Sequence, residues 1–380
     1  MTPPTAQLLD RPADRSRGKR TGKNALAIAD CDVHVVPGDQ KKELFPFLER
    51  RWQDYMASYG LRPRQGFAGG PAYPKGQPDA ARRDAYPPGG GKPGSSLAFM
   101  REQHLDPLNV QLAVLNPLRT GQGMQNLEFA TAFSRAINDW QVAEWTSKEP
   151  RTKASVVVTY EDAPAAVQEI ESRAGDPNFV QVLLLSRSAE PFGQKRYWPV
   201  FEAAAAAGLP VGIHAFGYGG APVTGGGWPS YYLEEMIGHA QCQQALLMSL
   251  VMEGVFERCP DLKIVLVEAG FAWLPSLCWR MDKLWARMRD EVPHVKRPPS
   301  EYVRRQVWLT TQPMEEPEVK PHLADTVKWI GWDRLLFATD YPHWDFDHPD
   351  HVLPMRVAEE NQTKFFLQNA IDLYRPRPVA

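Results

Sequence analysis

The sequence predicts an α/β protein built on a (β/α)8 barrel, with a long insertion rich in glycine and proline after the first strand. Three observations favour this architecture. Eight short apolar runs occur along the chain, longer segments of helical periodicity separate them, and most runs are apolar over about four to six consecutive residues. Strands of a parallel sheet that is covered on both faces have this uninterrupted pattern. An open, doubly wound parallel sheet is the alternative.

The predicted strands follow one another from Leu26 onward. They are LAIADCDVHVV (26–36), VQLAVLNP (110–117), KASVVVTY (153–160), FVQVLLLS (179–186), LPVGIHAFG (209–217), LKIVLVEAG (262–270), VWLTTQP (307–313) and RLLFATDYP (334–342). Helices are predicted over 124–150, 160–175, 198–208, 238–259, 272–291, 320–331 and 364–375. Strands that alternate with helices in this way indicate βαβ units and therefore a parallel sheet.

The chain is predicted to form one barrel domain over residues 26–380. Residues 1–25 precede it as a polar, basic leader without an apolar segment, which predicts disorder and not a secretory signal. The insertion covers about residues 43–96, and its later half has no periodicity. This composition predicts a surface loop, a lid or an arm that contacts a partner protein.

Composition excludes several functional classes. The formal net charge of −2 provides no field that would attract nucleic acid or an anionic membrane, and no apolar run approaches the length of a membrane span. The cysteines are scattered and include no C-x-x-C pair; they are Cys31, Cys242, Cys259 and Cys278. They predict reduced thiols and therefore a cytoplasmic protein.

Potential metal ligands occur at the carboxyl ends of four predicted strands, where (β/α)8 barrels place their reactive groups. Asp32 and His34 alternate in the first strand and therefore point to the same face, with Asp30 deeper on that face. The other strands contribute His214 from the fifth, Glu268 from the sixth, and Asp340 and His343 from the eighth.

Each of these residues has a structural alternative. His214 is compatible with a core histidine, Asp340 with a turn cap, and Glu268 with a buried ion pair. Taken together, however, three carboxylates and two imidazoles buried at one barrel mouth would be strongly unfavourable without a cation. The pattern therefore predicts a divalent metal held by oxygen and nitrogen ligands.

Four motifs resemble the amidohydrolase-related metal-dependent barrel family, which includes aminocarboxymuconate-semialdehyde decarboxylase and the resorcylate-type decarboxylases. The motifs are DVH, LPVGIHAF, FERCPDLKIVLVEAGFAWLPSLCWRMD and RLLFATDYPHWD, and the resemblance extends from Ala27 to about Tyr374. It implies a site in which one divalent metal, zinc by preference, is bound by Asp32, His34, His214 and Asp340. It also implies that Asp340 transfers a proton. Asp30 is expected to accept structural hydrogen bonds instead.

The sixth strand departs from the family pattern. The decarboxylases carry a histidine there in a Ser-His-Gly-Gly-like turn, whereas this chain has Glu268 in VEAG. A buried glutamate with a raised pKa can act as a general acid or base. With one metal, the expected reaction is hydrolysis of an amide, ester or lactone, or decarboxylation of a small acid. With a second metal at Glu268, His343 and His239, and with iron or manganese, the barrel would instead be an oxygenase that hydroxylates small acids.

A third hypothesis is a non-catalytic partner subunit that keeps one metal for structural reasons. Arg187 follows the fourth strand and could bind a substrate carboxylate. Its position in a loop favours the alternative, a charge exposed to solvent. The insertion and the tryptophan-rich segment 273–285 also predict a homo- or hetero-oligomer. The expected ligand is a small-molecule substrate, without nucleic acid or membrane partners.

Overall fold

The structure, a computed structural model, describes residues 26–60, 80–217 and 222–378. Eight strands form one sheet in chain order, and each pairs in parallel with the next. They are β1 (Ile28–Val33), β2 (Val110–Leu115), β3 (Thr152–Val157), β4 (Phe179–Leu185), β5 (Val211–His214), β6 (Ile264–Val267), β7 (Val307–Thr310) and β8 (Leu335–Leu336). Each strand overlaps a predicted run, so the barrel is confirmed and the doubly wound order is not observed.

The ring closes between β1 and the segment that follows β8. The Cys31 N–H donates to the Phe337 carbonyl oxygen at 3.0 Å, and the His34 N–H donates to the Tyr341 oxygen at 2.7 Å. Because β8 is only two residues long, Asp340 lies four positions beyond it and not at its last residue as predicted. The closing hydrogen bonds bring this segment beside β1, next to Asp32 and His34.

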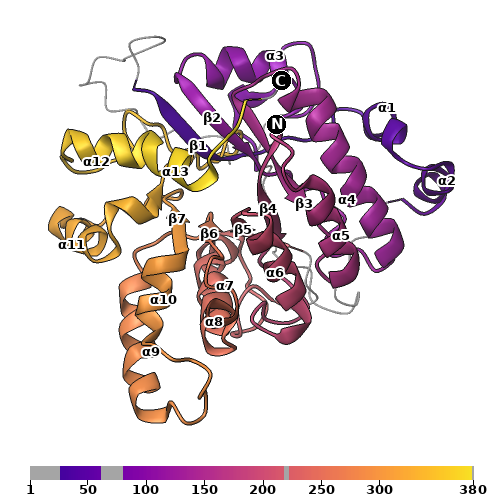
Figure 1. Cartoon of the computed structure of the whole chain (residues 1–380). Coiled ribbons are helices and arrows are strands. Elements are labelled where there is room, and N and C mark those ends of the chain that lie inside the picture. The colour runs from indigo at the N-terminus through magenta and orange to yellow at the C-terminus, as the bar shows by residue number, and fades with distance from the viewer. Residues whose placement is uncertain (1–25, 61–79, 218–221, 379–380) are drawn as a thin grey trace.

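Helices surround the strands (Figure 1). They are α3 (Leu97–Met100), α4 (Leu127–Gln141), α5 (Ala163–Arg173), α6 (Trp198–Ala206), α7 (Tyr232–Met252), α8 (Val255–Arg258), α9 (Leu274–Met288), α10 (Pro299–Gln306), α11 (Lys320–Ile330), α12 (Glu359–Thr363) and α13 (Asn369–Tyr374). Helix α7 begins before the predicted start at Gly238, because the Glu234 carboxylate accepts the Ser230 and Tyr231 N–H groups and caps it. Helix α10 was not predicted, since its buried apolar side chains are the adjacent Tyr302 and Val303 in an otherwise charged segment.

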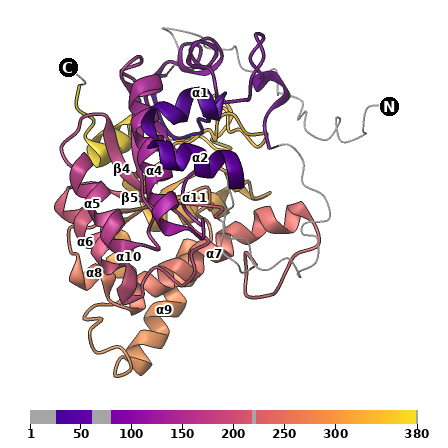
Figure 2. The same ribbon diagram turned by 90° about the vertical axis from the view of Figure 1, so that its right-hand side faces the viewer.

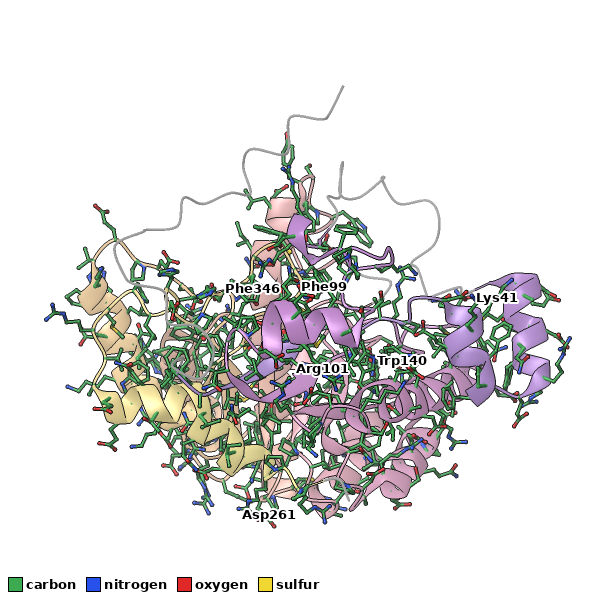
Figure 3. All side chains as sticks on the ribbon, turned by 90° about the horizontal axis from the view of Figure 1, so that it is seen from above. Lys41, Phe99, Arg101, Trp140, Asp261 and Phe346 are labelled. Atoms are coloured by element: carbon green, nitrogen blue, oxygen red, sulfur yellow. The ribbon has the colours of Figure 1, made fainter. Side chains whose placement is uncertain are left out.

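The first half of the insertion folds onto the outside of the barrel. Helices α1 (Gln40–Leu44) and α2 (Arg50–Tyr59) lie beside α4 (Figures 1 and 2). The Trp140 indole N–H of α4 donates to Glu43, and the Trp52 ring packs 5.5 Å from that of Phe129. Figure 3 shows Lys41 of α1 near the outer edge of this segment, with Trp140 closer to the barrel.

Part of the predicted loop can be placed. Residues 61–79 of the insertion and the predicted leader 1–25 lie outside the described residues. The part of the insertion after them reaches the barrel mouth, because the Arg82 N–H donates to the Pro342 oxygen and Ala81 pairs with His343.

Two predictions from composition are confirmed within the described residues. No described helix is long and apolar enough to cross a membrane. All four cysteines are free thiols, and Cys242 is the one that is not buried.

Candidate metal centre

The predicted ligands converge at the carboxyl end of the barrel. His34 Nε2 lies 3.4 Å from Asp32 Oδ1 and 2.7 Å from Asp340 Oδ1. His214 Nε2 lies 3.3 Å from Asp32 Oδ2 and 3.4 Å from Glu268 Oε2. His343 joins through its Nδ1, which is 2.7 Å from Asp340 Oδ1. All of these side chains are buried except that of His343, which is 17% exposed.

Hydrogen bonds set the tautomers of the two histidines that face the cluster. The Nδ1 atom of His34 donates to the Asn116 carbonyl oxygen at 2.7 Å, and Nδ1 of His214 donates to the Ala215 oxygen at 2.6 Å. Because Nδ1 is committed as a donor in each ring, Nε2 is the nitrogen that faces the cluster, and it can offer its lone pair to a cation once it has lost any proton. This is the arrangement that a metal ligand requires.

The cluster fits a divalent cation by two independent measures. Asp32 Oδ2, His214 Nε2 and Glu268 Oε2 are buried and have no hydrogen-bond partner among the described residues. Such atoms are costly unless an ion satisfies them. Ligand atoms that lie about 2.1 Å from a tetrahedral metal are about 3.4 Å apart, and about 3.0 Å apart around an octahedral one. The separations that involve Asp32 and Glu268, 3.3–3.4 Å, match the tetrahedral spacing, whereas the 2.7 Å between His34 Nε2 and Asp340 Oδ1 is that of a direct hydrogen bond.

The charge distribution keeps the acidic ligands ionised. Burial alone would raise the pKa of Asp32, but its interactions with His34 and His214 outweigh burial and lower that pKa. Asp340 likewise has a lowered pKa despite its burial, because His343 and His34 lie beside it. Burial would lower the pKa of His34, yet the Asp32 and Asp340 carboxylates raise it to about 9. Without a metal, His34 therefore holds a proton that a cation would displace.

Glu268 behaves differently from these ligands. Burial raises the pKa of Glu268 well above its usual value, and the carboxylates of Asp340, Asp345 and Asp32 raise it further. Its carboxyl therefore keeps its proton to a higher pH than an ordinary glutamate does. Glu268 also has a left-handed backbone, with φ at 54°, as does Asp340 at 61°. Non-glycine residues in this region are strained, and strain of this kind clusters at functional sites.

Two neighbours of the cluster were not predicted from the sequence. Asn116 donates through Nδ2 to Asp32 Oδ1 at 2.9 Å, and its backbone oxygen accepts from His34. It follows β2, so the rule about strand ends would have identified it. Asp345 lies 3.0 Å from Gln312 Nε2, and burial together with Asp340 raises its pKa to about 8. The sequence feature that could have identified Asp345 is its position two residues after His343.

Asp30 is a structural hydrogen-bond acceptor, as predicted. Its Oδ1 accepts the Thr339 N–H at 2.9 Å, and its Oδ2 accepts the Thr339 hydroxyl at 2.5 Å and His104 Nε2 at 2.8 Å. The His104 ring stacks on Tyr341. Because Thr339 precedes Asp340, this network fixes the backbone that carries the eighth-strand ligand.

The remaining predicted residues lie away from the cluster. His239 is buried on α7 and belongs to none of the compact ligand groups found among the described residues. It lies on the same helix face as Glu235 and Gln243, which are buried too. The expectation of a solvated charge at Arg187 is wrong, because the side chain is only 13% exposed and lies 3.6 Å from Glu235. The segment that follows β4 packs against α7, and this contact covers the Arg187 side chain.

Comparisons with known proteins agree with this geometry. A family model described as amidohydrolase matches residues 29–375. A gamma-resorcylate decarboxylase from Polaromonas is 29% identical over 266 residues, which cover 65% of this chain and 77% of that protein. The enzyme of the same name from Rhizobium radiobacter is 27% identical, with coverages of 67% and 79%.

Two solved structures share the fold. A 5-carboxyvanillate decarboxylase from Novosphingobium aromaticivorans, complexed with manganese, has a TM-score of 0.67, 18% identity, and coverages of 92% of this chain and 96% of its own. An amidohydrolase from Mycobacterium avium subsp. paratuberculosis has a TM-score of 0.66, 21% identity, and coverages of 91% and 98%. At these identities the likeness concerns the fold.

Proposed function

Because this chain belongs to the amidohydrolase family, and is in consequence a metal-dependent hydrolase or carboxy-lyase, we propose that it removes carbon dioxide from a small aromatic acid. The curated relatives are named for decarboxylation of a resorcylate, which supports the carboxy-lyase over the hydrolase. None of the comparisons supports the oxygenase alternative. The feature that carries the proposal is the buried Glu268 carboxyl, whose Oε2 lies 3.4 Å from His214 Nε2 and whose pKa is raised well above its usual value by burial.

Four residues would hold the cation in this proposal. Asp32, His34, His214 and Asp340 supply two carboxylates and two imidazoles, a mixed set that accepts zinc or manganese. When bound, the metal supplies Lewis-acid stabilisation of the negative charge on the substrate's carboxylate and hydroxyl oxygens. We favour zinc and one equivalent per chain. Two equivalents would instead indicate that Glu268 and His343 bind a second metal.

Glu268 is proposed as the general acid. It donates its proton to the ring carbon that carries the carboxylate, and the bond from that carbon to the carboxylate then breaks. The electron pair of the broken bond restores the aromatic ring, and carbon dioxide leaves. Glu268 must then regain a proton from solvent. Asp345, whose pKa is raised to about 8 by burial and by Asp340, would hold a proton for that step, and His343 lies beside it in contact with Asp340.

The proposal is tested with purified protein whose metal content is measured by plasma mass spectrometry. The protein is incubated with 2,6-dihydroxybenzoate and with 5-carboxyvanillate, and carbon dioxide and the phenolic products are quantified. In deuterium oxide, we expect one deuterium at the carbon that lost the carboxylate. Hydrolysis of aryl amides or lactones without release of carbon dioxide would overturn the carboxy-lyase in favour of the hydrolase.

We also infer an oligomeric, cytoplasmic enzyme. Trp279, Leu284 and Met288 of α9 are about half exposed, an apolar surface that a second subunit could cover. The free thiols fit a reducing compartment. Light scattering coupled to size-exclusion chromatography measures the assembly, and a monomer at micromolar concentration would remove the oligomer from the proposal.

A further inference from the structure

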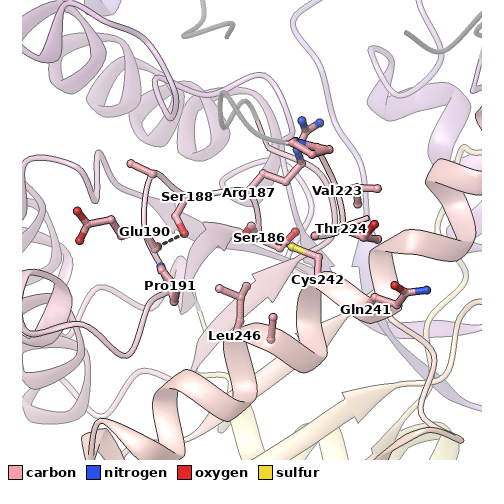
Figure 4. Close-up of a pocket in the computed structure, with 14 residues that line it drawn as sticks. Ser186, Arg187, Ser188, Glu190, Pro191, Val223, Thr224, Gln241, Cys242 and Leu246 are labelled. Carbon is pink, nitrogen blue, oxygen red and sulfur yellow. Dashed lines mark hydrogen bonds between the residues drawn. The ribbon is translucent and has the colours of Figure 1, made fainter. Parts of the chain in front are cut away.

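A cavity of about 430 Å3 lies between the loop after β4 and helix α7 (Figure 4). Ser186, Arg187 and Cys242 line it together with the apolar side chains of Val223 and Leu246. Its volume falls within the range of about 300–1,000 Å3 that is usual for small-molecule sites. The lining also holds the Glu190 carboxylate and the Gln241 amide, and apolar walls with a few polar groups are typical of such sites.

His239 connects this cavity to the cluster. It lies about one helical turn before Cys242 on α7, on the same face as Cys242 and Leu246. Its ring centroid is 4.5 Å from that of Phe216, and Phe216 stacks at 6.3 Å on His214, a cluster residue. On its other side, His239 feels the charge of Arg187 in the cavity wall. The imidazole thus contacts Phe216 on the side of the cluster and lies one helical turn from the cavity residue Cys242, although it does not itself line the cavity.

The state of His239 calls for a ligand. The side chain is 2% exposed, and neither ring nitrogen has a hydrogen-bond partner among the described residues. An unsatisfied buried polar group costs about 1–3 kcal/mol, so native proteins retain few of them without a reason. Burial, together with the charges of His214 and Arg187, lowers the pKa of His239 to about 3. The ring is therefore neutral and offers one donor and one acceptor.

Arg187 provides the charge that such a ligand would meet. Its Nη1 lies 3.6 Å from Glu235 Oε1. Charge-assisted hydrogen bonds are about 2.7–2.9 Å long, so this ion pair is loose and a ligand carboxylate can compete with Glu235 for the guanidinium. The guanidinium is mostly buried, which strengthens its attraction for an anion.

We propose that this cavity is a distal subsite for the substrate, and that it accepts a side arm that ends in a carboxylate. The arm would run from the metal cluster past Phe216, form a hydrogen bond with His239 and end beside Arg187. The inference rests on the proposed function, since it assumes that the reacting carboxylate lies at the cluster. It makes the preferred substrate an aromatic acid with a second, more distant carboxylate.

Cys242 allows binding in the cavity to be measured without turnover. It is the one cysteine that is not buried, so iodoacetamide should modify it first. We would measure its alkylation rate by mass spectrometry in the metal-loaded enzyme. The probes are 2,6-dihydroxybenzoate and its derivative with a 2-carboxyethyl arm at position 4. We expect saturating amounts of the extended acid to slow alkylation at least about tenfold, and the short acid to have little effect.

A kinetic experiment tests the same subsite through specificity. Ala245→Leu narrows the cavity from α7, and Ala286→Leu is the matched change on the exposed surface of α9. We expect Ala245→Leu to lower the ratio of kcat/KM for the extended acid over the short acid by about tenfold. His239→Phe should lower this ratio as well. Ala286→Leu should not change it.

The outcomes separate this inference from the proposed function. Protection of Cys242 by the extended acid without any decarboxylation would support the subsite and overturn the carboxy-lyase. Decarboxylation of both acids without protection, and with the same kcat/KM ratio in Ala245→Leu, would overturn the subsite and leave the carboxy-lyase standing.

Discussion

The two sides of the metal cluster are built differently. On the β1 and β5 side, Asp32, His34 and His214 have ordinary backbone conformations and hydrogen bonds that fix their ring and carboxylate positions. On the β6 and β8 side, Glu268 and Asp340 have strained left-handed backbones, and the carboxyls of Glu268 and Asp345 have raised pKa values. The first side has the properties of a metal holder. The second has the properties of a proton-transfer device around the ionised Asp340, because neighbouring groups with raised pKa values can hold and release protons.

Removing a ligand from the holding side should have the largest effect. We expect His214→Ala to lose its metal and at least about a thousandfold in kcat, because three ligands remain and the freed space leaves Asp32 and Glu268 facing each other. Metal content and carbon dioxide release measure the two losses. His294→Ala, a change to a histidine that bonds the Met252 carbonyl oxygen, is the control. If His214→Ala kept its full metal content and normal turnover, the β1 and β5 side would not be the side that holds the metal.

A change on the proton side should separate activity from metal binding. Glu268→Gln keeps the shape of the side chain but cannot donate a carboxyl proton. We expect it to retain its metal and to lose about 10²–10⁴-fold in kcat, the usual contribution of general acid catalysis. The pH dependence of kcat should lose its basic limb, the loss of activity as Glu268 deprotonates. A parallel loss of metal would mean that Glu268 belongs to the holding side.

Asn116 provides a finer test of the holding side. Asn116→Ala removes the hydrogen bond to Asp32 while leaving the backbone acceptor of His34 in place. Changes to such supporting residues typically cost about 10–100-fold in metal affinity. Competition with a fluorescent chelator measures that affinity. Asn138→Ala removes an equally buried amide that bonds to the Val157 backbone, so it should lower stability without changing metal affinity.

The sequence was informative where side-chain periodicity and position coincide. Eight apolar runs and their helices predict the barrel, and the rule that reactive groups follow the strands then identifies Asp32, His34, His214, Glu268 and Asp340. The same rule applied to β2 would also have given Asn116. The barrel prediction is confirmed, and the candidate ligands lie together because a parallel barrel brings the carboxyl ends of all its strands to one face, whatever the loops contain.

Packing between distant segments could not be predicted in this way. Arg187 follows a strand in a polar loop, and only the position of α7 shows that Glu235 and the helix cover it. His239 has the spacing of an exposed helix face, and its burial depends on Phe216 from another loop. The raised pKa of Asp345 likewise results from a fold in the segment after β8 that returns it to Asp340 and Gln312.

The pH dependence of the metal-free protein should show the smallest effect. His34 has a pKa of about 9, above its usual 6.5, because the Asp32 and Asp340 carboxylates outweigh the effect of burial. The folded state therefore binds this proton more tightly than the unfolded state does. The resulting stabilisation is complete below pH 6.5 and is lost as the pH rises through 9. The shift corresponds to at most about 3 kcal/mol, or a few degrees in Tm.

Thermal unfolding with and without a chelator measures this difference between pH 6.5 and 9. Asp345 adds a decline of the same sign between about pH 4 and 8, since its pKa is also raised, and Asp345→Asn removes that contribution. In the metal-loaded protein, His34 carries no proton on Nε2, so the loss of stability caused by His34 at high pH should vanish. Metal affinity should rise with pH up to about 9, because the metal competes with that proton. A decline of the same size with the metal bound would place the responsible proton outside the holding side of the cluster.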